Sequence, residues 1–218
     1  MTIDELLARS VLLEAKLSAF LSLPLAEATI RLRATRTLAS LGFEHAQSVK
    51  HLVAAGLCTS AAALLRVQYE SLVRALWVLY VATDDQAGLL LAELTGQTAK
   101  QASKIPMLSQ MLEGIELKAP HAPVSHLKEF KHFSWRPLSS YVHGGIHAVS
   151  RHGKGFPVEL VLMEIRHSNG LLGIAGNLLQ ILAGIPPQSG KMADIYAEFP
   201  DCFPPADSPF EHRPEPAY

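Results

Sequence analysis

Apolar residues recur every three or four positions along most of the chain, which is the spacing of one face of an α-helix. Residues 4–21 show the pattern, with Leu6, Leu13 and Leu17 among the repeating positions and Pro24 closing the segment. No stretch alternates apolar and polar residues as a strand does. We therefore expect an all-α fold. The predicted helices span residues 4–21, 26–55, 61–81, 85–104, 125–133, 137–149 and 157–183, with a less regular helical piece ending near 114.

Prolines and glycines mark the breaks between these helices. Two prolines predict a loop over residues 117–124, and Pro137 is expected in the first turn of the helix that it opens. Eight of the fourteen prolines fall in the last 33 residues, so residues 186–218 are predicted to be an extended tail. Residues 1–185 then form one domain, a mostly antiparallel bundle of five to seven helices.

The composition indicates that much helix surface is buried. Hydrophobic residues make up 49% of the chain and charged residues 18%, which excludes disorder for most of its length. Because some of this surface is expected to pack against another subunit, we predict at least a homodimer. The net charge of −1 gives no global basic field, so a nucleic-acid partner would need a local basic patch.

The sequence lacks the marks of a secreted or membrane protein. It does not begin with the basic start and apolar run of a signal peptide, and Cys58 and Cys202 are two lone cysteines. The most apolar stretch, residues 61–81, is interrupted by three charged residues and is a poor membrane span. We expect a cytoplasmic protein without a membrane partner.

The helix predicted over residues 61–81 carries a ladder of charge on an otherwise apolar surface. Arg66, Glu70 and Arg74 are four residues apart and share one stripe of the helix, with Trp77 one step further on. Because burying unpaired charge is costly, the ladder should either pair internally, with Trp77 stacked on a guanidinium, or line a site. If it is a buried ion triad, loss of Glu70 should cost on the order of 3 kcal/mol.

A second group of polar residues belongs to one predicted helix. Arg136 directly precedes the start of this helix at Pro137, and Ser140, His143 and His147 fall along one side of it. A cation beside the free N–H groups of a first helical turn favours an anion or phosphate site. The alternative is a polar seam of the core in which the histidines are buried and hydrogen-bonded.

Two pairs of residues resemble the ligand pattern of di-metal helical bundles. They are Glu129 with His132 and Glu164 with His167, and Glu70 could add a further carboxylate. About 0.6 such pairs are expected by chance in a chain of this composition, so two are a mild excess. We predict no metal and no cofactor, and keep a di-metal carboxylate bundle as a minor alternative.

Two segments resemble signature sequences of uncharacterised bacterial all-helical families. The first is residues 61–77, which hold the Arg, Glu, Arg and Trp of the ladder, and the second is residues 138–145, which read Leu-Ser-Ser-Tyr-Val-His-Gly-Gly. Together with His45 on the preceding helix, the likeness covers about residues 40–180. It implies a shared fold more than an activity.

More distantly, the order of the helices and the spacing of Arg136 and His143 resemble the HEPN superfamily. Its active members are metal-independent ribonucleases of toxin and antiphage systems that use an Arg and a His, usually across a dimer interface. The resemblance implies that Arg136 would hold the scissile phosphate. It also implies that His143 would serve as general base or acid on the ribose 2′-hydroxyl.

The leading hypothesis is a HEPN-like bacterial protein that binds RNA, and that cleaves it if Arg136 and His143 are exposed in a shared cleft. A nucleotide, an antitoxin or another product of a neighbouring gene are further expected partners. The alternative is a non-catalytic regulatory or scaffold module, in which these two side chains can be buried and satisfy each other. The remaining candidate binding residues are His45, Arg66, Glu70, Arg74, Trp77, Ser140 and His147.

Overall fold

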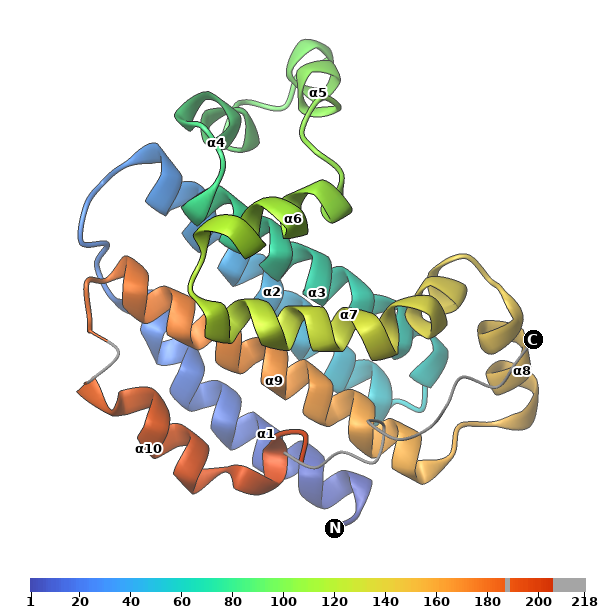
Figure 1. Ribbon diagram of the computed structural model, residues 1–218. Helices are drawn as coiled ribbons and strands as arrows, with labels where there is room; N and C mark the ends of the chain where they lie inside the picture. Colours follow the sequence, from blue (N-terminus) through green and yellow to red (C-terminus); the bar gives the residue numbers. More distant parts are fainter. Residues whose placement is uncertain (187–188, 206–218) are drawn as a thin grey trace.

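The computed structural model describes residues 1–186 and 189–205 (Figure 1). Within these ranges the chain forms ten α-helices, short 3₁₀ helices and no strand. The predicted all-α class is confirmed, and the expected number of five to seven helices is too low. The helices are α1 (Ile3–Ser18), α2 (Ile30–Ala54), α3 (Cys58–Tyr80), α4 (Asp84–Leu90), α5 (Gly96–Ala102), α6 (Leu108–Lys118), α7 (His121–Val142), α8 (Ile146–Lys154), α9 (Val158–Leu182) and α10 (Lys191–Glu198), with 3₁₀ helices η1 (Ala19–Ser22) and η3 (Pro200–Cys202).

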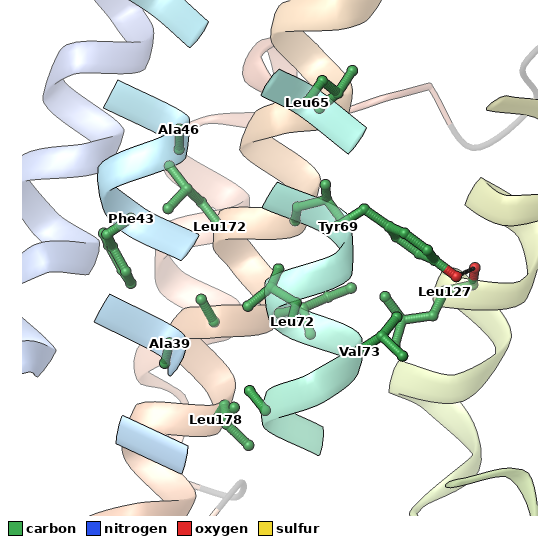
Figure 2. Packing of buried hydrophobic residues seen from close by; sticks show 14 of the residues in the cluster. Ala39, Phe43, Ala46, Leu65, Tyr69, Leu72, Val73, Leu127, Leu172 and Leu178 are labelled. Atoms are coloured by element: carbon green, nitrogen blue, oxygen red, sulfur yellow. Dashed lines mark hydrogen bonds between the residues drawn. The ribbon is translucent and has the colours of Figure 1, made fainter. Parts of the chain in front are cut away.

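Helix α3 is the central helix of the bundle. It packs against α2, α6, α7 and α9, and α1 covers α9 from the other side (Figure 1). Tyr69, Leu72 and Val73 of α3 are fully buried. Figure 2 shows Leu72 of α3 in the same cluster as Phe43 of α2 and Leu172 of α9. Since each fully buried aliphatic or aromatic side chain contributes about 1.5–3 kcal/mol, this contact region holds the long helices together.

Buried polar side chains tie the long helices at defined positions. Gln68 of α3 donates to the carbonyl of Ser168 at 3.0 Å, and the Ser168 hydroxyl donates back to Gln68 Oε1 at 2.7 Å. The Tyr69 hydroxyl donates to the carbonyl of Leu127 in α7 at 3.1 Å (Figure 2). Asn169 of α9 donates to the Ser10 hydroxyl of α1 at 2.7 Å. Because a buried polar group without a partner is costly, these bonds set the register of α1, α3, α7 and α9.

Helix α7 differs most from its prediction. Residues 117–124 are largely helical instead of a loop, and Pro137 lies inside α7 instead of opening a helix. A proline inside a helix removes one backbone hydrogen bond, but buried side chains on both sides of Pro137, such as Leu127 and Tyr141, hold α7 against the bundle. The break comes later, where Gly144 adopts a φ of +64°.

Residues 85–104 also differ from their prediction, because they form α4 and α5 instead of one helix. Each begins with a threonine cap: the Thr83 hydroxyl accepts from the Gln86 N–H at 3.2 Å, and the Thr95 hydroxyl accepts from the Thr98 N–H at 3.1 Å. The two helices project from one end of the bundle in Figure 1.

The C-terminal region is more regular than predicted. Within residues 186–218, where an extended tail was expected, residues 191–198 form α10. The segment after α10 is held to α1, because the Arg9 guanidinium pairs with Asp201 at 2.9 Å and lies 4.6 Å from the centre of the Phe199 ring. Amphipathic spacing, with Met192 and Ile195 buried, outweighs the local excess of proline. The rest of the predicted tail, residues 206–218, lies outside the described residues.

In the part of the chain that the structure describes, no helix is both long enough and apolar enough to cross a membrane.

Candidate functional site

The charged side chains of the α3 ladder interact mainly with other side chains of the protein. Arg66 Nε donates to Glu70 Oε1 at 2.8 Å, as its spacing predicts. The Arg66 guanidinium lies 4.1 Å from the centre of the Trp135 ring of α7. The predicted role of Trp77 in stacking is therefore taken by Trp135, while Trp77 is buried in the core. The ladder joins α3 to α7, and Arg74 is half-buried on the same stripe.

Arg136 and His143 are both exposed on α7. They are seven residues apart, two helical turns, and therefore point to the same side of the helix. His143 is the C-terminal cap residue of α7, with its N–H donating to the Ser139 carbonyl at 3.1 Å. Because Arg136 lies in the body of α7, the predicted anion site at a helix start beside Pro137 is wrong.

Ser140 and His147 belong to different helices, contrary to the prediction of one shared side. The Ser140 hydroxyl accepts a hydrogen bond from the His147 backbone N–H at 3.0 Å, which links the end of α7 to the start of α8. The His147 ring is exposed, as is that of His143, so the alternative of a buried histidine seam is wrong for both. His45 is half-buried on α2, where burial lowers its pKa.

Helices α7 and α8 carry an excess of positive charge. Residues 121–155, here called the basic segment, contain five Lys and Arg residues against one Glu, together with six of the ten histidines. The segment has a formal charge of +4, whereas the whole chain has −1. Lys128, Arg136 and Lys154 are exposed, and Lys131 and Arg151 are half-buried. Residues 31–66 have the same formal charge of +4, but there Lys50 and Arg66 form ion pairs with Glu14 and Glu70.

A groove of about 760 Å³ lies between α7, α8, α9 and the chain that follows α10. Its walls are mainly apolar and aromatic, with Phe130 and Leu138 of α7 facing Met163 and Leu171 of α9. Arg136 and His143 do not line it. Its polar residues are His126, Glu129, Ser134, Tyr141, His147, Arg151, Glu164 and His167.

Two ionisable residues of α9 stand out within this groove, Glu164, which is buried, and His167, which is half-buried. Burial raises the pKa of Glu164 to about 8, against a smaller lowering by the Arg151 cation, so the carboxyl is protonated at pH 7. Burial lowers the pKa of His167 to about 4, and its ring meets the Phe130 ring edge-on at 5.5 Å. Glu164 is 4% exposed, and its Oε2 has no hydrogen-bond partner.

The metal hypothesis depends on several ligand side chains meeting in space. Within residues 1–186 and 189–205, no three His, Cys, Asp or Glu side chains gather closely enough to hold a metal ion. Glu129, Glu164 and His167 all line the groove, but they do not form such a set. The arrangement offers an apolar cavity with isolated polar groups.

Fold and site together define an all-α bundle with a basic helix pair beside an apolar groove. The chain belongs to a family of unknown function, DUF6988, whose model matches residues 39–205. The matched region contains the charged ladder, the basic segment and α9. No curated protein and no solved structure matches the chain.

Proposed function

We propose that this protein binds RNA through the basic segment, in the cytoplasm and in a toxin or antiphage defence context. The observation that carries the proposal is the formal charge of +4 on residues 121–155 in a chain whose net charge is −1. Nucleic-acid affinity comes largely from Lys and Arg residues that neutralise phosphates and release counterions. Phe133 is exposed in the same segment and supplies a ring of the kind that stacks on unpaired bases.

The proposal includes cleavage by Arg136 and His143. The His143 imidazole would take the proton of the ribose 2′-hydroxyl, and that oxygen would attack the adjacent phosphorus. The bond to the 5′ oxygen then breaks, and this oxygen recovers a proton from the imidazolium. Arg136 would stabilise the charge that builds on the phosphate oxygens.

This chemistry requires a second copy of the chain. Arg136 and His143 are exposed, which the ribonuclease hypothesis needs, but they lie outside the groove of the single chain. Pairing two α7 helices would place these side chains in a cleft between subunits. A homodimer is therefore part of the proposal, and sedimentation measurements on the protein test it.

The binding test compares charge reversal inside and outside the basic segment. Fluorescence anisotropy of a labelled single-stranded RNA should show affinity that falls as salt rises, with a log–log slope of about −0.7 for each phosphate contacted. Lys154→Glu should weaken binding about tenfold or more at low salt. The matched control is Lys100→Glu on α5, an exposed lysine outside the segment, and it should bind within about twofold of the parent. Equal effects of the two reversals would contradict the proposal.

A non-catalytic regulatory or scaffold module is the second candidate. The observation that favours it is that Arg136 and His143 share no cleft within one chain. Incubation of the purified protein with total cellular RNA and a chelator separates the candidates. RNA binding without cutting, by a protein shown to be dimeric, would favour the regulatory module.

A further inference from the structure

The apolar groove between α7, α8 and α9 has the properties of a ligand site that RNA binding does not use. Its volume of about 760 Å³ lies within the 300–1,000 Å³ typical of small-molecule pockets. The walls formed by Phe130, Leu138 and Leu171 offer few hydrogen-bonding or charged groups to a base or phosphate of RNA. An apolar ligand would find ordinary packing surfaces there.

One end of the groove has hydrogen-bonding capacity that the protein leaves unused. The Oε2 atom of Glu164 is buried and has no hydrogen-bond partner, although an unsatisfied buried polar atom costs about 1–3 kcal/mol. In contrast, the buried Gln68 side chain donates to the Ser168 carbonyl and accepts from the Ser168 hydroxyl, both on α9. Other buried atoms also lack a partner, among them Thr35 Oγ1, Arg66 Nη1, Asn169 Oδ1 and Gln180 Nε2, but of these residues only Glu164 lines the groove, where a ligand can complete its hydrogen bonding.

The charge at this end of the groove indicates the kind of ligand. The protonated Glu164 carboxyl offers an O–H donor, and the Arg151 guanidinium offers N–H donors close by. His147 of α8 also lines the groove, with its ring centre 6.3 Å from that of Tyr141. A donor-rich end attached to apolar walls complements an anionic, acceptor-rich head group on an apolar body.

We propose that the groove binds an apolar monocarboxylate, with its carboxylate held by Arg151 and by the Glu164 O–H, and its hydrocarbon or aromatic body packed along α7 and α9. The site shares Arg151 and His147 with the basic segment, but the proposed catalytic residues Arg136 and His143 do not line the groove.

The pH dependence of binding follows from the groups around Glu164. When Glu164 ionises above its pKa of about 8, it loses its O–H donor and repels a carboxylate. The titratable and charged groups nearest to it in the groove and at its edges are Cys58, Glu129, Tyr141, His147, Arg151 and His167. His167 is already neutral at pH 7 because its pKa is about 4, so it does not change charge between pH 7 and 9.

The test uses decanoate as the anionic probe and decylamine as its cationic match, with binding followed by calorimetry on the full-length protein. At pH 7 decanoate should bind and decylamine should bind at least about tenfold more weakly, because each charge-assisted hydrogen bond is worth about a factor of ten. Decylamine that binds as tightly as decanoate would overturn the proposal, and so would the failure of decanoate to bind.

Three variants sharpen the test. Arg151→Gln should weaken decanoate about tenfold, whereas Lys154→Gln, an exposed cation further along α8, should leave it unchanged. From pH 7 to 9 the affinity of the parent should fall about tenfold as Glu164 loses its proton, and Glu164→Gln should show no such fall. Identical pH profiles for the parent and Glu164→Gln would overturn the role of Glu164.

The RNA measurements keep the two proposals apart. Glu164→Gln should bind labelled RNA as the parent does, and Lys154→Glu should bind decanoate as the parent does. If the protein binds decanoate but does not bind RNA, the proposed function is wrong and the proposed ligand site is supported.

Discussion

The charged ladder of α3 and the polar residues along α7 to α9 are two ionisable regions set in apolar surroundings, and they differ in how their charge is compensated. In the ladder, Arg66 forms an ion pair with Glu70 and stacks on Trp135, although its Nη1 is buried without a hydrogen-bond partner. In the groove, Glu164 is more deeply buried than Glu70 and yet its Oε2 has no hydrogen-bond partner. The first region holds the fold together, and the second has capacity left for a ligand.

The ladder contributes mainly to stability, whereas the basic segment and the groove are the regions proposed to bind ligands. The ladder is the most conspicuous pattern in the sequence, but its internal pairing gives it a structural explanation. The basic segment and the groove are inconspicuous in the sequence, because their residues are spread over α7, α8 and α9. The predictions below test this division, beginning with the largest expected effect.

The largest effect concerns cleavage. Arg136→Ala and His143→Ala should each reduce RNA cleavage in the presence of a chelator by about a hundredfold or more. Both side chains are exposed, so the melting temperature should stay close to that of the parent. Growth arrest on expression should disappear with the same two substitutions.

His152→Ala is the matched control, because His152 is an exposed histidine of α8 to which no catalytic role is assigned. It should cleave as the parent does. If His143→Ala cleaves normally, or loses activity only because it no longer folds, the assignment of His143 is wrong.

The next effect is the dependence of stability on pH. Glu164 has a folded-state pKa of about 8, raised from 4.5, so folding retains its proton and stability falls as pH rises between these values. His167 acts in the opposite direction between pH 4 and 6.5, because its folded-state pKa is lowered to about 4. Between pH 6.5 and 8 only Glu164 of these two residues changes stability. The free energy of unfolding should therefore fall by at most about 2 kcal/mol over this range.

Denaturant unfolding of the parent and of Glu164→Gln at pH 6.5 and 8 measures this contribution. The variant should lack the fall that the parent shows. An equal pH dependence in both proteins would mean that the Glu164 carboxyl is solvated, and the contrast with the ladder would fail.

A smaller effect is expected at the ladder. Complete burial of the triad would make the loss of Glu70 cost on the order of 3 kcal/mol. The Arg66 and Glu70 side chains are 15% and 29% exposed, so water compensates part of the loss. Glu70→Ala should destabilise by about 1–2 kcal/mol, between the values for surface and buried pairs.

The control for this measurement is Glu113→Ala, which removes an exposed carboxylate of α6 and should change stability by less than about 0.5 kcal/mol. A Glu70→Ala protein as stable as this control would show that the ladder does not hold α3 to α7.

Much of the fold could be predicted from local pattern. The all-α class and the central place of α3 follow from helical periodicity and from the apolar residues that surround the ladder. The break predicted at Pro137 is misplaced. A proline usually marks a helix boundary, but here the packing of Tyr141 and its neighbours keeps α7 continuous.

The candidate site was less accessible to prediction. Glu164 and His167 were noted only as a metal-like pair, because spacing within one helix cannot show what the facing helices contribute. Arg151 falls between the predicted helices 137–149 and 157–183, and its closeness to Glu164 depends on how α8 folds back after Gly145. The groove is formed by contacts between helices, and these contacts cannot be inferred from the sequence of any one helix.

The most direct test of RNA binding by the basic segment is ultraviolet cross-linking of the purified protein to RNA, followed by mass spectrometric mapping of the cross-linked peptides. We expect the cross-links to concentrate within residues 121–155, with the exposed Phe133 as a favoured position, and to diminish in Lys154→Glu. Cross-links that concentrate on α1, α4 or α5, or that are unchanged by this charge reversal, would contradict the account.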